Sequence, residues 1–342
     1  VVRRDRFPAS PLLNYLGKRL PGGLYREMFR RAAAIRADVY HIHDLKVNTI
    51  GEKLRRLQHG PELVYDVHEP YPENILDYWP RQGFKALLRN PWSARVKRWE
   101  RSAVKNYNLI IVTEENMRER FKSFFPAKPV EIIYNFTNLP PADEEPAATI
   151  KEYDAIYTGG ITTWRGAWQI LEAVIIAKDT RPSIKVLFLG SWFPPDLREE
   201  MSRFIVKHDL QDNIVLKDAV PYQDVADYYR KSRIGLGIFL PILTHRIILQ
   251  IKIFEYMNYG LPILGSYFGH IAGIMEKHGC GLAVDPANPE AIARGLLELL
   301  SDEKANASMS NNGRIAAKDH YRWDRMEEKL LELYRDLTGG RG

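Results

Sequence analysis

Short apolar runs of strand length alternate with helix-like segments along most of this chain, and no other feature restricts its fold more. Four such runs occupy the first part of the sequence: DVYHIHD (38–44), LVYDVHE (63–69), LIIVTE (109–114) and VEIIYN (130–135). Alternation of this kind predicts parallel strands joined by crossover helices. The pattern stops at residues 137–151, TNLPPADEEPAATIK, and restarts at DAIYTGG (154–160). The sequence therefore predicts an α/β fold with two Rossmann-like domains.

The domain boundaries follow from this interruption, and the 342 residues fit two domains of about 150 residues each. We expect an amino-terminal domain over residues 1–136, a linker over 137–151 and a carboxy-terminal domain over 152–319. A last helix within 320–342 is expected to pack back on the first domain. Ligands of open parallel sheets bind at the carboxyl ends of the strands, so two facing sheets predict a cleft lined by these ends.

The composition argues against a membrane-spanning or disulfide-rich protein. No stretch approaches the roughly 20 apolar residues that a membrane helix needs. The charged opening VVRRDRF does not resemble a secretory signal. The single Cys280 allows no internal disulfide and suits a reducing compartment. We therefore expect a cytoplasmic protein.

Positive charge is concentrated in two stretches of the first part of the chain. Residues 1–60 hold thirteen Lys and Arg against five Asp and Glu, and residues 81–105 hold eight against the single Glu100. This surplus predicts an anionic partner. The helical spacing of Trp92 and Trp99 fits a basic amphipathic segment lying on an anionic membrane surface, which would make the protein peripheral on the cytoplasmic face. The alternative is a core-facing helix with a solvated basic face. No recognised nucleic-acid motif accompanies the charge, so no nucleic-acid partner is expected.

A glycine-rich turn in the second half, YTGGITTWRGAWQIL (157–171), is the first candidate for ligand binding. Gly159 and Gly160 let the backbone approach a ligand closely, and the following helix offers free N–H donors to an anion. Arg165 adds a planar cation suited to phosphate oxygens. The alternative is a tight turn between strand and helix with a solvated arginine.

The segment LPILTHRIILQIKIFEYMNYGLPILGS (240–266) is a second candidate. Lys252 lies in the first turn of a helix, where its charge opposes the helix dipole and favours a bound anion. Glu255 stands among apolar residues of the same helix, and a buried carboxylate needs hydrogen-bond donors, which two ribose hydroxyls would supply. A simple Lys252–Glu255 pair within the helix is the alternative.

Several of these motifs together resemble glycosyltransferase family 4. They are the YTGG…RG turn, KIFEYMNYGLPILGS (252–266), GCGLAVDPANPEAIARGLLELLSD (279–302) and RWDRMEEKLLELYRDL (322–337). The resemblance covers residues 38–337 and implies a retaining, nucleotide-sugar-dependent enzyme of the GT-B fold. The first domain of the family normally opens with a strand, a glycine-rich loop and a helix. Nothing here matches that opening, so the resemblance implies that a βα unit of at least ~30 residues is absent.

The resemblance also implies roles for single residues of the second half. Glu255 matches the second glutamate of the family's E-x7-E motif, which holds the nucleotide ribose, whereas Ile247 stands at the first position. Some branches use a His-containing loop followed by a Lys instead, which His245 and Lys252 match. Arg165 and Lys252 would then neutralise the donor phosphates, because Gly160 occupies the position of the family's usual arginine. The remaining donor-side candidates are Val220 and Tyr222 beside the base and Ser191 at a strand end.

His-acid pairs end two strands of the first half, His43-Asp44 and His68-Glu69. Their side chains fit three interpretations: a zinc site, caps of the strand ends, or an acceptor site. The resemblance implies that His68 lies beside the reacting sugar as a catalytic residue together with Arg165 and Lys252. It also implies that His43, Asp44 and Glu69 lie on the acceptor side. It implies no metal and no cofactor, because cationic side chains and helix ends neutralise the leaving diphosphate.

These observations predict a hexosyltransferase-type enzyme of polysaccharide or glycoconjugate biosynthesis. It would move a sugar from a nucleoside-diphosphate donor, a UDP-sugar before a GDP-sugar, to a hydroxyl of a glycan or a lipid-linked acceptor. The departure at Ile247 leaves a second hypothesis open. The protein would then bind nucleotide sugars or glycans without catalysis on a decayed scaffold of the same fold.

Overall fold

The computed structural model describes residues 22–79, 83–137 and 150–339, which form two compact units. The amino-terminal unit comprises the residues up to 134 together with those from 325 onward. The carboxy-terminal unit comprises residues 135–324. Each unit contains its own parallel sheet, so the predicted α/β fold with two domains is confirmed. Most of the predicted linker, 138–149, lies outside the described residues, and the predicted cleft stays a prediction.

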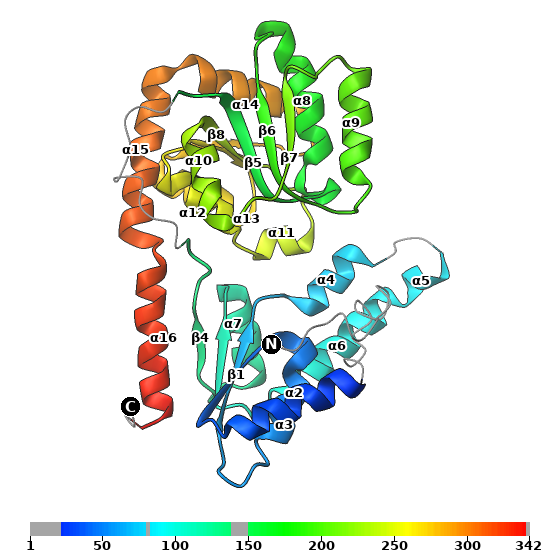
Figure 1. Ribbon diagram of the computed structural model, residues 1–342, viewed down its shortest axis with the longest axis vertical. Helices are drawn as coiled ribbons and strands as arrows, with labels where there is room; N and C mark the ends of the chain where they lie inside the picture. Colours follow the sequence, from blue (N-terminus) through cyan, green and yellow to red (C-terminus); the bar gives the residue numbers. More distant parts are fainter. Residues whose placement is uncertain (1–21, 80–82, 138–149, 340–342) are drawn as a thin grey trace. The chain divides into compact units, whose positions relative to one another are not determined.

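The amino-terminal unit is a four-stranded parallel sheet in the order β1-β2-β3-β4 (Figure 1). Its elements before the carboxy-terminal unit are α2 (Gly22–Ile35), β1 (Val39–His43), α3 (Asp44–Leu54), β2 (Glu62–Val67), α4 (Tyr71–Tyr78), α5 (Phe84–Leu87), α6 (Arg89–Ala103), β3 (Leu109–Val112), α7 (Glu115–Phe124) and β4 (Val130–Ile132). The chain returns to this unit in α16 (Trp323–Leu337).

The two faces of this sheet differ because side chains alternate along each strand. Tyr40 and Ile42 of β1 and Tyr65 of β2 point to one face, where they join the apolar core formed with α3 and α7. His41 and His43 therefore point to the other face. Helix α16 contacts the edge strand β4, because Lys329 forms an ion pair with Glu131 at 3.0 Å and donates to the carbonyl of Ile132.

The described residues of the basic segment 81–105 include two helices, α5 and α6. Val96 of α6 is buried with Leu45, Ile75 and Trp79, and Trp92 and Trp99 pack against the same cluster. The aromatic face of α6 thus contributes to a small core, as the core-facing interpretation predicts. Exposed apolar side chains occur just before α6, where Leu87 and Leu88 are 72% and 44% exposed.

The carboxy-terminal unit is a six-stranded parallel sheet in the order β10-β9-β8-β5-β6-β7. Its strands are β5 (Tyr153–Ile161), β6 (Val186–Trp192), β7 (Ile214–Asp218), β8 (Ser232–Gly237), β9 (Ile263–Ser266) and β10 (Gly281–Val284). Its helices are η3 (Thr163–Arg165), α8 (Ala167–Thr180), α9 (Leu197–Lys207), η4 (Tyr222–Asp224), α10 (Val225–Arg230), α11 (Leu243–Ile247), α12 (Ile251–Asn258), α13 (Gly269–His278), α14 (Pro289–Ser301) and α15 (Glu303–His320).

Helices cover both faces of this sheet (Figure 1). One core lies between the sheet and α8, α9 and α14, and a second lies between the sheet and α10, α12, α13 and α15. The strands are consequently apolar on both faces, as is usual for parallel sheets. Strand order reverses at β5 and β8, and the carboxyl ends of strands next to such a reversal are the usual ligand position in this architecture.

Candidate functional site

Strand β5 ends in Gly159, Gly160 and Ile161, and the turn that follows, with these residues the glycine turn, brings Arg165 back over the end of the strand. Gly159 adopts a φ of +93°, a conformation that favours glycine. The Arg165 guanidinium donates to the carbonyl of Gly160 at 3.3 Å, and a Cβ at Gly160 would lie 2.8 Å from Nη1 of that arginine. Helix α8 begins directly after Gly166 and carries no acidic residue in its first turn. The turn therefore gathers a guanidinium and a helix N-terminus, which together suit an anion.

Lys252, the second residue of α12, lies next to this turn. Its Nζ is 3.5 Å from the ring centroid of Tyr157 and 5.4 Å from that of Phe239, and its Cε lies 3.7 Å from a Cβ built on Gly159. The side chain is buried, and within the described parts of the chain Nζ has no hydrogen-bond partner. Burial and the nearby Arg165 guanidinium lower the pKa of this ammonium well below its ordinary value. A bound anion would supply the missing partner.

Glu255 is buried one helical turn further along α12 and is held by two tyrosines. Tyr222 donates to Oε1 at 2.8 Å and Tyr229 donates to Oε2 at 2.5 Å. Burial, followed by the Glu255 charge, raises the pKa of both hydroxyls, so each keeps the proton that it donates. The Lys252–Glu255 pair considered from the sequence is wrong, because neither residue makes that contact. The two tyrosine hydroxyls satisfy the carboxylate with neutral donors.

The other donor-side candidates lie at the same end of the strands or nearby. Ser191 is exposed near the end of β6 and is the register partner of Gly160. His245 is buried in α11, and its Nδ1 contacts the carbonyl of Leu240 at 2.8 Å. Val220 packs on the core next to η4, whereas Tyr222 is 46% exposed. The half-exposed Tyr222 thus connects the buried Glu255 to the surface.

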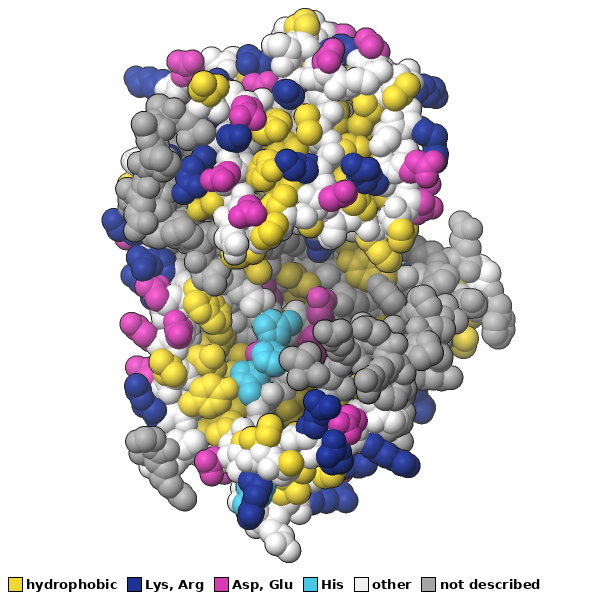
Figure 2. Space-filling model, viewed as in Figure 1, with side chains coloured by type: hydrophobic (Ala, Val, Ile, Leu, Met, Phe, Trp, Pro, Cys, Tyr) yellow, Lys and Arg dark blue, Asp and Glu magenta, His cyan; other side chains and the backbone are white. Residues whose placement is uncertain are grey.

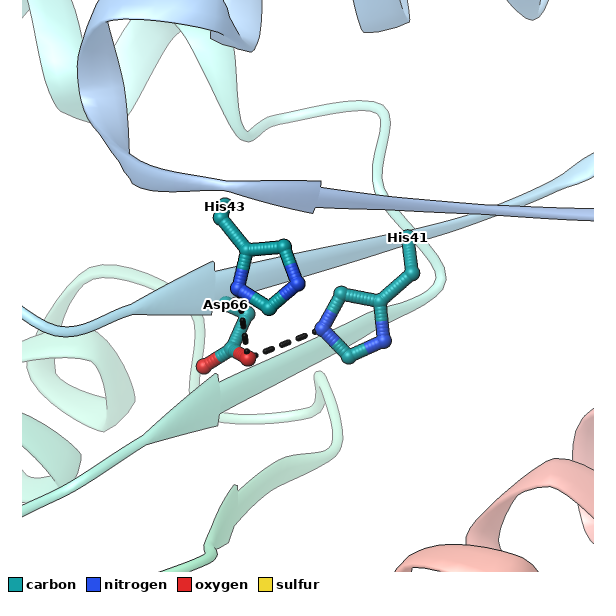
Figure 3. A group of neighbouring side chains, drawn as sticks. All are labelled: His41, His43 and Asp66. Atoms are coloured by element: carbon teal, nitrogen blue, oxygen red, sulfur yellow. Dashed lines mark hydrogen bonds and ion pairs between the residues drawn. The ribbon is translucent and has the colours of Figure 1, made fainter. Parts of the chain in front are cut away.

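In the amino-terminal unit three histidines surround one carboxylate. The Oδ2 atom of Asp66 lies 2.9 Å from His41 Nε2, 3.1 Å from His43 Nδ1 and 3.0 Å from His68 Nε2. The histidine side chains gather on the surface of this unit in Figure 2, and Figure 3 shows His41 and His43 of β1 turned toward Asp66 of β2. Burial alone would raise the pKa of Asp66, but hydrogen bonds from His41 and His68 outweigh it and hold the pKa well below its usual range. The hydrogen bond to Asp66 raises the pKa of His68.

The acidic partners predicted from the sequence have other contacts. Asp44 opens α3 with a φ of +64° and accepts a hydrogen bond from the backbone N–H of His68 at 3.2 Å. Glu69 accepts from the side chain of Asn74 at 2.9 Å. His43 precedes α3 in the N-cap position and makes no side-chain capping hydrogen bond to that helix, and the interpretation of the histidines as caps of the strand ends stays a prediction.

Sequence reasoning missed His41, Asp66 and Tyr229. The signal for the first two is the spacing His41-x-His43 on one strand beside Asp66-x-His68 on and after the next, since residues two apart share a face of the sheet. Tyr229 carries no comparable signal, because its contact with Glu255 joins residues 26 positions apart.

Comparison with known proteins decides the family. The profile of the family Glycosyl transferases group 1 matches residues 142–316, just over half of the chain. The profile Glycosyltransferase Family 4 matches residues 2–139. The chain belongs to the glycosyl transferases group 1. It is a glycosyltransferase of the GT-B fold, as the resemblance of its motifs implies.

Individual relatives of this glycosyltransferase are distant. An uncharacterized glycosyltransferase of Methanocaldococcus jannaschii is 21% identical over 312 residues, which are 87% of this chain and 75% of that protein. Sucrose-phosphate synthase from Thermosynechococcus elongatus superposes with a TM-score of 0.69 at 18% identity, covering 97% of this chain and 82% of the other. HepE from Anabaena, solved with UDP-glucose, superposes with a TM-score of 0.71 at 15% identity, covering 96% and 85%. At these identities the superpositions show the fold.

The sequence also predicts a chain without a membrane-spanning helix. Among the residues that the structure describes, no helix combines the length and the apolar character needed to cross a bilayer.

Proposed function

We propose that this glycosyltransferase moves a hexose from a UDP-sugar, with retention of configuration, to a hydroxyl of a glycan or a lipid-linked acceptor. One observation supports this more than any other: the buried Nζ of Lys252, without a hydrogen-bond partner among the described residues, beside the glycine turn and Arg165. The Anabaena protein of the same fold binds UDP-glucose, which favours uridine over guanosine as the base of the donor.

In this proposal the diphosphate binds at the glycine turn. Its oxygens would accept from Lys252, from Arg165 and from the first N–H groups of α8. The charge on the leaving diphosphate grows as the bond to the sugar breaks, so fixed cations there lower the barrier to transfer. Gly159 has no side chain that could block this approach, and its positive φ is a conformation that favours glycine.

Glu255 would bind the ribose hydroxyls in the same proposal. Its oxygens are held by Tyr222 and Tyr229, and Tyr222 is the half-exposed partner of the two. The ribose would take the place of the Tyr222 hydroxyl on Oε1, while the buried Tyr229 keeps Oε2. The displaced Tyr222 ring and Val220 would then contact the base, and Ser191 and His245 would line the donor sugar and phosphates.

The transfer step needs no metal, cofactor or protein nucleophile in this proposal. The bond between the anomeric carbon and the diphosphate oxygen breaks, and a bond to the acceptor oxygen forms on the same face of the sugar. The acceptor proton passes to the leaving diphosphate, so atoms and charges balance. His68 would orient the reacting hydroxyl, and His43, Asp44 and Glu69 would bind other hydroxyls of the acceptor.

An anionic membrane surface is a further partner in the proposal, carried by the basic residues of 1–60 and 81–105. The side chains of Arg95, Lys97, Arg98 and Arg101 on α6 are exposed, and Leu87 and Leu88 are exposed just before that helix. Basic residues beside exposed apolar ones suit the interface of an anionic bilayer. This arrangement favours a lipid-linked acceptor over a soluble glycan.

The proposal is tested by comparing ligands that differ only in phosphate. Lys252→Ala and Arg165→Ala should each weaken UDP binding about 10- to 150-fold, because charge-assisted hydrogen bonds contribute roughly 1.5–3 kcal/mol, and should leave uridine binding nearly unchanged. Lys207→Ala, an exposed lysine of α9, is the matched control. Calorimetric titration measures both ligands, and equal losses for UDP and uridine contradict the phosphate role.

A second measurement separates the enzyme from a binding protein on a decayed scaffold. The wild-type protein is incubated with UDP-hexoses and with glycan or lipid-linked hydroxyl acceptors, and release of UDP and the configuration of the new linkage are followed by NMR. Release of UDP with a retained configuration supports the proposal. Tight binding of UDP-hexoses without any release of UDP supports the non-catalytic alternative.

A further inference from the structure

The group formed by His41, His43 and Asp66 in the amino-terminal unit has the chemistry of a metal site. One ligand atom from each residue lies within 4.8 Å of the other two, and these ligands are two imidazoles and one carboxylate (Figure 3). The two imidazole rings stack with centroids 4.5 Å apart. Each ring also has one nitrogen close to the same oxygen, Asp66 Oδ2. Strand pairing fixes this arrangement, because His43 is the register partner of Asp66 and His41 shares its face.

Hydrogen bonds account for part of this group but not for all of its polar atoms. Those from His41 and His68 use the two lone pairs of Asp66 Oδ2, yet a third ring nitrogen, His43 Nδ1, lies 3.1 Å from the same oxygen. The other oxygen, Oδ1, is buried and has no hydrogen-bond partner in the described parts of the chain. His43 Nδ1 and His68 Nε2 also lie 3.4 Å apart. Three ring nitrogens and one carboxylate thus converge on a small volume.

A divalent transition metal accounts for this convergence. Tetrahedral zinc with bonds of roughly 2.0–2.1 Å holds its ligand atoms about 3.3 Å apart, and the nitrogen–oxygen distances here are 2.9 and 3.1 Å. The Nδ1 atom of His41 contacts the hydroxyl of Tyr334 on α16. A metal-ligating histidine usually donates its other ring N–H to such a partner, which leaves the lone pair on Nε2 for the metal.

We propose that His41 Nε2, His43 Nδ1 and Asp66 Oδ2 bind a divalent transition metal, with zinc preferred among the abundant ions. His68 Nε2, 3.0 Å from the same carboxylate oxygen, lies where a fourth ligand belongs. Two or three imidazoles with one carboxylate favour zinc, cobalt or nickel over magnesium or calcium, which prefer oxygen ligands. The site shares His43 and His68 with the acceptor site of the proposed function, and it belongs to a different unit from Lys252 and Arg165.

Metal binding at this site should also change the residues that bind the acceptor in the proposed function. With the metal bound, His43 and His68 orient around the ion rather than toward a sugar hydroxyl. A zinc-loaded protein should therefore keep its affinity for UDP, which binds to the other unit in the proposed function, and should lose affinity for the acceptor.

Metal binding to the full chain tests the inference directly. The protein is freed of metal with a chelator and titrated with Zn²⁺ in competition with a chromophoric chelator, and with Co²⁺ while the visible spectrum is recorded. We expect one tightly bound ion per chain and the intense visible bands of low-coordinate cobalt. His43→Ala should weaken binding at least tenfold, and because His43 has a 61% exposed side chain this variant should fold. Asp66→Asn and His41→Ala should weaken it at least as much.

The matched control is the second histidine pair of the chain, His278 and His320, whose rings lie 5.5 Å apart in the carboxy-terminal unit. The double variant His278→Ala/His320→Ala should bind zinc and cobalt like the wild type. Absence of a retained ion overturns the inference. An affinity that is unchanged in His43→Ala, or that falls only in the double variant, also overturns it.

Discussion

Each unit buries a glutamate inside one of its helices, Glu100 in α6 and Glu255 in α12, and these two acids differ in what surrounds them. Glu100 of α6 is fully buried, forms an ion pair with Arg120 at 3.2 Å and accepts from Tyr65 at 3.3 Å. Glu255 of α12 is 6% exposed and, among the described residues, accepts from two tyrosine hydroxyls. Both acids follow an aromatic residue in a helix, but Arg98 and Arg101 flank Glu100, whereas apolar residues flank Glu255.

The two glutamates differ in the exposure and the charge of the side chains that contact them. The tyrosine beside Glu100 is as buried as the acid itself, so no ligand can replace it. Tyr222 beside Glu255 is 46% exposed and carries no charge, so a ligand hydroxyl can take its place without leaving an ion unpaired. A buried acid with an exposed, neutral partner is thus a candidate for ligand binding, whereas a buried acid with a buried, charged partner maintains the fold.

The largest expected effect is on stability and concerns Glu100. Glu100→Ala leaves the guanidinium of Arg120 buried with Glu73 as its remaining partner, and breaking a buried pair in this way costs about 3–5 kcal/mol. Glu255→Gln should cost less, about 1–2 kcal/mol, because the amide keeps one acceptor and the half-exposed Tyr222 can turn its hydroxyl to solvent. Urea unfolding measures both, with the exposed Glu119→Gln as control. Equal losses of stability in the two variants would remove the distinction between the acids.

The second effect is the pH dependence of stability. Burial raises the pKa of Glu100 to about 7, against an opposing effect of Arg120. Because the folded state then holds a proton that the unfolded state releases, the contribution of Glu100 to stability is fully present below pH 4.5 and is lost as pH rises toward 7. The contribution lost is up to about 3 kcal/mol at 1.36 kcal/mol per pKa unit. Unfolding curves between pH 4.5 and 8 should show this decline, and Glu100→Gln should flatten it; an unchanged slope in the variant would contradict the assignment.

The third effect is on ligand discrimination and concerns Glu255. If its carboxylate accepts from both ribose hydroxyls, UDP should bind at least about 10- to 150-fold more tightly than 2′,3′-dideoxy-UDP, since hydrogen bonds to a charged group contribute roughly 1.5–3 kcal/mol. Glu255→Gln should reduce this ratio, and the exposed Glu276→Gln should not. Calorimetric titration of both nucleotides into the folded variants measures the ratio. A preference that survives Glu255→Gln rules out the ribose role.

The smallest effect concerns Tyr222, the exposed partner. Tyr222→Phe removes the hydroxyl that donates to Glu255 Oε1, so an incoming ribose no longer competes with it. We expect UDP affinity to rise a few-fold, because a neutral hydrogen bond contributes about 1 kcal/mol net. Tyr228→Phe on the neighbouring helix α10 is the control. A loss of UDP affinity in Tyr222→Phe would mean that this hydroxyl binds the nucleotide rather than occupying its place.

The sequence predicts the fold well because alternation is a local property. The period of apolar runs identifies both parallel sheets, and the burial of Glu255 follows from its apolar neighbours. The partners of Glu255 do not follow, since Tyr222 and Tyr229 reach it from positions 33 and 26 residues away. Such contacts depend on how helices pack across a sheet, which no short pattern records.

The histidine cluster shows a second reason why the sequence alone does not predict all residues of a site. Pairs adjacent in sequence, His43-Asp44 and His68-Glu69, attract attention in a linear reading, yet Asp44 already belongs to α3 and Glu69 lies after β2. The residues that meet are His41 and His43 of β1 with Asp66 of β2 and His68 just after it. The pairing of β1 with β2 and its register bring them together, and register is a property of two strands rather than of either one.

Helix α16 has a consequence for the order of events during synthesis. This helix supplies Tyr334 to His41, 293 residues earlier in the chain, and Lys329 to Glu131. The ribosome makes the 190 residues of 135–324 between the two parts of the amino-terminal unit. At roughly 5–20 residues per second this takes about 10–40 s. The amino-terminal unit, whose synthesis begins first, is therefore complete only after α16 has been made. The carboxy-terminal unit is complete before that helix.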